Sequence, residues 1–189
     1  MKRLLLPLLA FTFVCSLSNS AQALPGESVQ TVKNRIANNA AFSPIKRGIG
    51  ELSGAPFYRS QAKLPDGELS FVMNADRQDQ RSTVEAIAFG ATQPFAGFTR
   101  ENVSLIYQTF GKATTQEFVR SQYIAKVDFN QVEKRFYRGR TFGYVTSMFK
   151  QSQDGRKYYH FMVLPLSDFN AQLQADQQCR RSSADICGD

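Results

Sequence analysis

The sequence predicts a small α+β domain in which antiparallel strands, in one sheet or more, pack against helices. Segments with the 3.6-residue period of amphipathic helices occur near the start, in the middle and near the end of the chain, and strand-like runs lie between them. Two short turn signals, Pro65-Asp66-Gly67 and Asp154-Gly155, join neighbouring strand-like runs. Because such short turns connect antiparallel strands, the two observations together indicate hairpins packed against helices.

The first half of the chain is expected to form one helix and three strands. Val29, Val32 and Ile36 recur on one face of a helix that should end before Pro44. The expected ranges are 27–41 for the helix and 57–63, 68–75 and 82–89 for the strands. In the third strand, alternation places Val84, Ala86 and Ala88 on one side and Thr83, Glu85 and Ile87 on the other.

The second half is expected to contain two helices, three strands and a final helix. Thr99 should cap the first of these helices, and Gly111 should end it. The other expected ranges are 114–125 for a helix, 132–137, 141–150 and 156–164 for strands, and 167–178 for the last helix. The helical residues expected to face the core are Val103, Ile106, Tyr107, Phe110, Phe118, Val119 and Tyr123. The order of elements suggests a degenerate duplication of a helix-plus-three-strand unit.

Residues 98–114 read F-T-R-E-N-V-S-L-I-Y-Q-T-F-G-K-A-T. This stretch is similar to the helical start of the repeats in envelope domains of the beta-lactamase-inhibitory-protein type. The resemblance concerns the fold alone and implies a repeated α+β unit.

The first 23 residues have the layout of a secretory signal peptide. Lys2 and Arg3 give a charged start, residues 4–17 are apolar, and Ala21-Gln22-Ala23 is a small-residue cleavage site. The apolar stretch is shorter than the ~20 residues that a membrane-spanning helix needs. We therefore expect cleavage after Ala23 and an exported bacterial protein, periplasmic or extracellular, with no transmembrane segment. A lipoprotein anchored at Cys15 is disfavoured because large residues precede that cysteine.

Cys179 and Cys187 are the cysteines that remain after such processing. An even pair in an oxidising compartment predicts a disulfide, which would close a C-terminal tail, residues 179–189, behind a single domain spanning 24–178. No metal site or cofactor is expected, because the sole histidine, His160, is distant in sequence from both cysteines and no phosphate-binding loop pattern occurs.

The mature chain is mildly basic. Loss of the signal peptide takes the number of basic residues from 23 to 21 against 16 acidic ones, which gives a formal charge of +5. One local concentration stands out as a candidate anion-binding cluster: Lys134, Arg135, Arg138 and Arg140. Positive charge in an exported protein favours contact with anionic envelope polymers or lipid head groups, but an ordinary solvated surface is the commoner explanation.

Residues 138–145 read R-G-R-T-F-G-Y-V and resemble the base-stacking strand of RNA-recognition-motif domains. Thr141 and Ser147 depart from that pattern, which has a glycine and an aromatic residue at these places. In that family a helix follows the strand, whereas here the Asp154-Gly155 turn leads into a second strand. We therefore expect no nucleic-acid partner and an ordinary hairpin strand.

A two-residue turn at Asp154-Gly155 would set Met148 opposite Phe161 on one face of that hairpin. Phe142 and Tyr144 would share this apolar face. We predict that Phe142 is a core residue and that Tyr144 is partly buried with its hydroxyl near the rim.

Motifs that would name a reaction are missing from the sequence or lack their companions. The pattern S-x-x-K occurs at residues 43–46 and 60–63, but the S-D-N and K-T-G motifs of serine beta-lactamases are absent. We expect a non-enzymatic binding or interaction module of the cell envelope, with an envelope protein or an anionic polymer as partner. The alternative is a small envelope hydrolase that uses carboxylates or His160.

Overall fold

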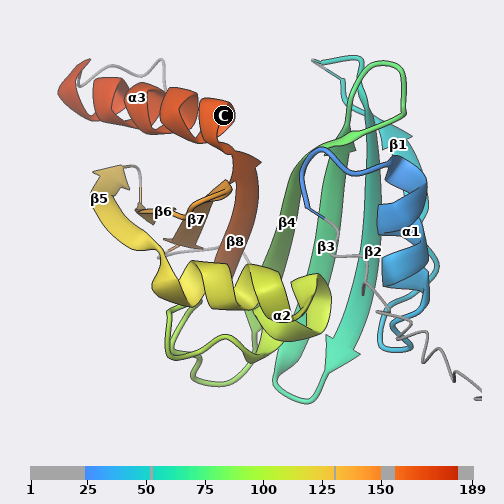
Figure 1. Cartoon of the computed structure of the whole chain (residues 1–189). Coiled ribbons are helices and arrows are strands. Elements are labelled where there is room, and N and C mark those ends of the chain that lie inside the picture. Colours follow the sequence, from blue (N-terminus) through green and yellow to red (C-terminus); the bar gives the residue numbers. More distant parts are fainter. Residues whose placement is uncertain (1–23, 52, 130, 150–155, 183–189) are drawn as a thin grey trace, which may run out of the picture.

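The computed structural model describes residues 24–51, 53–129, 131–149 and 156–182, which form one eight-stranded antiparallel sheet and three helices (Figure 1). The elements are α1 (Val29–Ala37), β1 (Lys46–Ile49), β2 (Pro56–Leu64), β3 (Gly67–Ala75), β4 (Ser82–Ala91), α2 (Ser104–Arg120), β5 (Gln122–Phe129), β6 (Val132–Arg138), β7 (Phe142–Phe149), β8 (Lys157–Pro165) and α3 (Leu166–Ser182). The strand order is β1-β2-β3-β4-β8-β7-β6-β5. Each half of the chain therefore supplies half of the sheet, and the predicted α+β class is confirmed.

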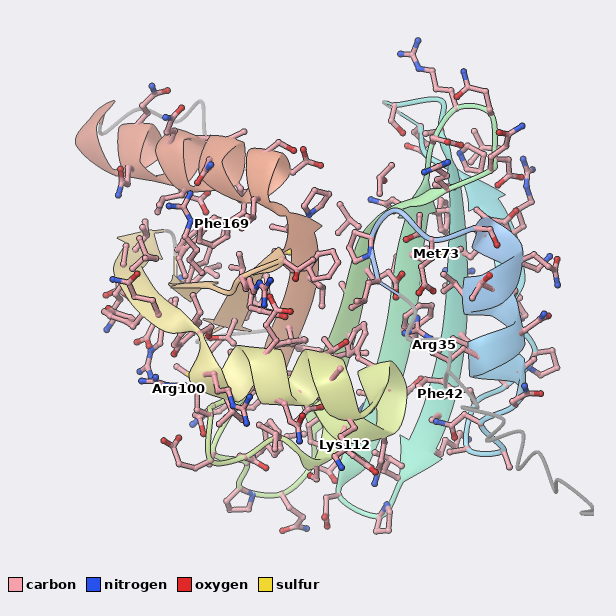
Figure 2. The ribbon with its side chains drawn as sticks, viewed as in Figure 1. Arg35, Phe42, Met73, Arg100, Lys112 and Phe169 are labelled. Carbon is pink, nitrogen blue, oxygen red and sulfur yellow. The ribbon has the colours of Figure 1, made fainter. Side chains whose placement is uncertain are left out.

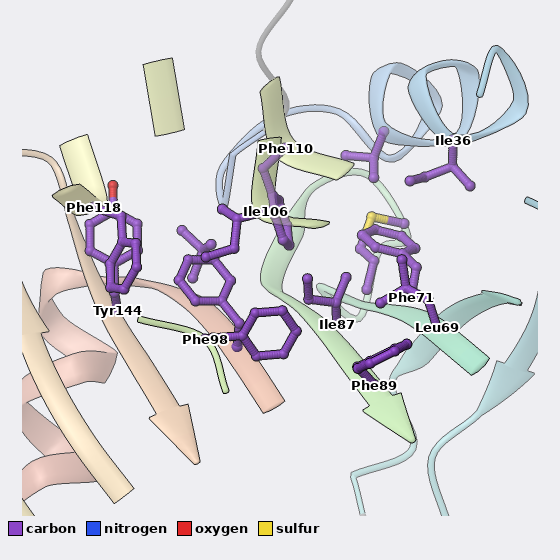
Figure 3. Packing of buried hydrophobic residues seen from close by; sticks show 14 of the residues in the cluster. Ile36, Leu69, Phe71, Ile87, Phe89, Phe98, Ile106, Phe110, Phe118 and Tyr144 are labelled. Atoms are coloured by element: carbon purple, nitrogen blue, oxygen red, sulfur yellow. The ribbon is translucent and has the colours of Figure 1, made fainter. Parts of the chain in front are cut away.

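The main core lies on the face of the sheet that carries α1 and α2, which we call the first face. Ile36 of α1 and Ile106 and Phe110 of α2 are buried against strand residues that include Phe71 and Ile87 (Figure 3). Aromatic rings meet throughout this core, and Phe110 lies 5.6 Å from Phe161 between ring centroids. The chain has no tryptophan, and phenylalanine and tyrosine rings supply the large aromatic surface of this core.

A smaller core lies on the opposite, second face, beneath α3. Phe169 of α3 points toward the strands (Figure 2) and packs on Phe136, with ring centroids 5.8 Å apart. Successive residues of one strand serve the two cores, since Tyr144 belongs to the first and Val145 to the second. Helix α3 contacts β5, β7 and β8, so it covers only the C-terminal half of this face.

Each half contributes four strands, so the prediction of three per half was wrong. The short β1 was missed because its four residues are not buried and carry no alternating apolar pattern. The start of β5 was assigned to a helix over 114–125, but α2 ends at Arg120 and the backbone of Ser121 is extended. The duplication itself stays a prediction.

Helix α2 begins at Ser104, not beside Thr99, whose hydroxyl instead accepts a hydrogen bond from the backbone of Asn102. Gly111 interrupts the helix with a φ of 81°, as the sequence indicated, and the chain then continues as a second helical segment. The prediction that Tyr107, Val119 and Tyr123 face the core was wrong, because all three are exposed. Helix α3 continues to Ser182, past the expected end at residue 178.

The hairpin of β7 and β8 forms, but its register differs from the predicted one by two residues. Thr146, and not Met148, lies opposite Phe161. The turn itself falls outside the described residues. An even shift leaves every side chain on its predicted face, so Phe142 is a core residue as expected. Tyr144, however, is fully buried, and its hydroxyl is not near a rim.

Candidate binding surface

The predicted anion-binding residues lie on β6 or in the turn after it: Lys134, Arg135, Arg138 and Arg140. Because side chains alternate along a strand, Lys134 and Arg135 point to opposite faces of the sheet. Lys134 pairs with Asp176 of α3 on the second face, and Arg135 pairs with Glu133 on the first face. Both cations are therefore neutralised by neighbouring acids. Arg138 and Arg140 are exposed. The structure does not bring the four together as one basic patch.

His160 lies on the second face of β8, where its ring is 4.8 Å from that of Phe149. Burial lowers the pKa of His160. In the sheet its neighbours are Ala88 on β4 and Ser147 on β7, and no carboxylate in the described part of the chain forms a hydrogen bond with it. Among the described residues, His160 therefore has no acidic partner of the kind that a histidine base in a hydrolase uses.

The second face of β2, β3 and β4, together with the adjoining part of β8 before Leu164, carries no helix directly above it within the described ranges, and we call this surface the open face. It consists of three cross-strand rows: Arg59, Val72, Ala86 and Met162; Gln61, Ser70, Ala88 and His160; Lys63, Glu68, Gly90 and Tyr158. The core-facing residues of β3 and β4 alternate with these along each strand. The open face is thus a continuous surface over four adjacent strands.

The middle of the open face is a shallow depression because β4 contributes only small side chains there. Ala86, Ala88 and Gly90 follow one another along this strand, while larger side chains stand on β2 and β8 at either side. A Cβ at Gly90 would lie 2.9 Å from the ring of Tyr158. Any other residue at this position would therefore force the ring to move. A depression of about 180 Å³ lies here, lined by Gln61, Glu68, Ser70, Ala88, Gly90, Arg156 and Tyr158.

The charge on the open face is mostly positive and lies along its β2 side. Arg59 and Lys63 are exposed, and Glu68, directly opposite Lys63 in the register, is the acidic residue among the three rows. Arg156 adds a further cation at the edge of the depression. The surface therefore combines small residues on β4, apolar side chains on β8 and a basic margin on β2.

A buried ion pair between α1 and β4 was not predicted. Arg35 Nη2 lies 2.5 Å from Glu85 Oε2, and Glu85 is fully buried. Ser82 Oγ donates to the second oxygen of Glu85, and the Arg35 guanidinium lies 5.6 Å from the ring centre of Phe110. The signal was present in the sequence, because alternation places Glu85 on the same side of β4 as the core residue Ile87.

No protein-family model, curated protein or solved structure shows significant similarity to this chain. The resemblance of residues 98–114 to repeats of beta-lactamase-inhibitory-protein-like domains therefore has no support from a matching structure. No helix in the described part of the chain is long and apolar enough to cross a membrane.

Proposed function

We propose that this protein is an exported, non-enzymatic binding module of the cell envelope, and that its open face binds an acidic segment of another envelope protein. The proposal is based on one observation: a helix covers only part of the second face of the sheet. The second face bears α3 over the C-terminal half and no described helix over β2, β3 and β4.

The shape of the open face favours an extended protein segment as the occupant. The floor formed by Ala86, Ala88 and Gly90 runs along one strand, with a spacing of roughly 6.6 Å between successive rows. A partner segment that lies along β4 could pack apolar side chains against Met162 and Tyr158 on β8 and place acidic ones beside the basic residues of β2.

Charge favours an acidic segment over a neutral one. Arg59 and Lys63 form one margin of the open face, and positive charge at the margin of an interface speeds association with a negatively charged partner. Glu68 beside Lys63 makes the surface less suited to a uniformly charged polyanion.

The hydrolase alternative receives less support. The buried carboxylate of Glu85 has no exposed surface and already accepts from Arg35 and Ser82, so a substrate could not reach it. His160 lacks an acidic partner among the described residues.

The test is photo-cross-linking in a bacterium that exports the protein. A photoreactive residue replaces Ala88 on the open face, and the matched control replaces Gln116, which is exposed on α2. We expect a discrete protein adduct from position 88 and none from position 116. Arg59→Glu combined with Lys63→Glu should remove most of the adduct, because the margin would then repel an acidic partner.

Three results would contradict the proposal. They are the absence of an adduct at position 88, the same adduct from both positions, and an adduct that the charge reversals leave unchanged. An adduct to carbohydrate or lipid would contradict the protein partner specifically.

A further inference from the structure

The segment that precedes α1 is tied to the start of β4. The backbone N–H of Gly26 donates to Ser82 O at 2.7 Å, and the N–H of Ser82 donates to Glu27 O at 2.9 Å. The N–H of Glu27 in turn donates to Leu24 O at 2.9 Å. Leu24 also packs against the main core. Leu24 is therefore held beside Glu27 by a fixed backbone turn.

One oxygen of the Glu27 carboxylate, Oε2, is buried and has no hydrogen-bond partner among the described residues. The neighbouring carboxylate of Glu85, on β4, is paired with Arg35 of α1 at 2.5 Å. The charged groups that act on Glu27 are these two, so one cation serves two carboxylates.

The effect on Glu27 is large. Burial, reinforced by the negative charge of Glu85, raises the pKa of Glu27 to about 7. Arg35 and a hydrogen bond from the backbone of Leu24 oppose this rise. The backbone of Leu24 is thus among the groups that act on the Glu27 carboxylate, and the turn between the two residues keeps it nearby.

We propose that Glu27 and its surroundings form a binding site for a primary ammonium, and that the ligand is the chain's own amino terminus at Leu24. Cleavage after Ala23 hydrolyses the Ala23–Leu24 peptide bond: water adds, a carboxylate remains on Ala23, and the Leu24 nitrogen becomes an ammonium group. That nitrogen belongs to the residue that the backbone turn holds beside Glu27. Processing thus converts a neutral amide nitrogen into a cation beside Glu27.

The ion pair distinguishes the processed chain from its precursor in their dependence on pH. In the precursor Glu27 has a raised pKa, so its contribution to stability is complete below its unfolded pKa of roughly 4.3 and is lost as pH rises through about 7. In the processed chain the ammonium favours ionised Glu27. The pair then stabilises the fold at neutral pH and is lost as the amino group deprotonates in alkaline solution.

The direct test is the titration of the α-amino group in protein purified after export, with mass spectrometry to confirm that it begins at Leu24. Reductive ¹³C-methylation preserves the charge of the amino group and makes it visible by NMR. We expect its pKa to lie at least about one unit above the ordinary range of about 7.7–8.0. Glu27→Gln should return it to that range, and Glu51→Gln, at an exposed carboxylate, should not change it.

A second measurement detects the same pair through stability. One glycine inserted between Ala23 and Leu24 leaves a processed chain whose ammonium is displaced by one residue. At pH 7 we expect the unfolding equilibrium constant to rise about ten-fold, the equivalent of one pKa unit. In the Glu27→Gln background the insertion should have no such effect. An ordinary α-amino pKa, an equal effect of the insertion in both backgrounds, or a processed chain that begins elsewhere would overturn the proposal.

Discussion

The two halves of the sheet have the same number of strands but differ in what lies on the second face. Over the C-terminal half this face carries large apolar residues, among them Phe136, Val145 and Leu164, and α3 covers them. Over the N-terminal half the corresponding positions hold residues such as Gln61 and Ser70, with no described helix above them. The open face therefore does not have the composition of a hydrophobic core that happens to be exposed. Its composition suits contact with both water and a partner.

The largest effect should come from truncating a side chain beneath α3. Phe136 is fully buried against Phe169, so Phe136→Ala should destabilise the protein by about 3–5 kcal/mol. Val72→Ala, on the open face, should cost less than about 1.5 kcal/mol because Val72 is only partly buried and fewer contacts are lost. Denaturant unfolding of the two variants makes the comparison. Equal losses would show that the two halves of the second face are alike.

Breaking the buried ion pair should have a comparable or slightly smaller effect. Arg35→Ala leaves the buried Glu85 carboxylate without its cation, which should cost about 3–5 kcal/mol. The matched control is Arg47→Ala, which removes a solvent-exposed pair with Asp79 and should have a much smaller effect. If both variants unfold at the same denaturant concentration, the pair between α1 and β4 contributes no more than a surface contact.

His160 should make the free energy of unfolding decrease in acid. Because burial lowers its pKa in the folded state, the unfolded chain binds more protons, and stability falls as pH drops below the unfolded pKa of about 6.5. His160→Gln should remove this part of the pH dependence. Unfolding midpoints of both proteins between pH 7.5 and 5 give the difference, which isolates His160 from other titrating groups. A difference that does not change with pH would contradict the expectation.

The smallest effect should come from the buried hydroxyl of Tyr144. This oxygen lies near Glu117 but has no hydrogen bond of ordinary length and angle within the described part of the molecule. Burial, with the nearby Glu117 carboxylate as a smaller cause, raises the pKa of Tyr144. Removing an unsatisfied polar atom costs little, so Tyr144→Phe should change stability by less than about 1 kcal/mol, in either direction. A loss above about 2 kcal/mol in thermal or denaturant unfolding would show that the hydroxyl is bonded in solution.

Alternation and turn signals were enough to predict the fold class, the main strands and the faces of β7 and β8. The register of that hairpin was not predictable, because it depends on the loop at residues 150–155 and both registers keep Phe161 in the core. The end of α2 was misplaced because Tyr123 continues a helical apolar pattern in a segment that is a strand.

The candidate site was largely missed, for a different reason. Alternation shows that Ala86 and Ala88 share one side of β4, but it does not show whether a helix covers that side. The basic cluster on β6 failed as a site because neighbouring residues of a strand point to opposite faces, and because Lys134 has its own acidic partner on α3. The pairing of Cys179 with Cys187 remains a prediction, since Cys187 lies outside the described residues, as does the proposed signal peptide.

The central claim, that the open face is occupied by a partner in the cell, is tested most directly by thiol labelling in place. Gln61→Cys puts a reactive group at the depression on the open face, and Gln116→Cys puts one on the exposed side of α2. The labelling rate of each is compared between exporting cells and purified protein, with the unsubstituted chain as background. We predict that Gln61→Cys reacts several-fold more slowly in cells than when purified, while Gln116→Cys reacts equally in both. Equal rates for Gln61→Cys in the two settings would contradict the account.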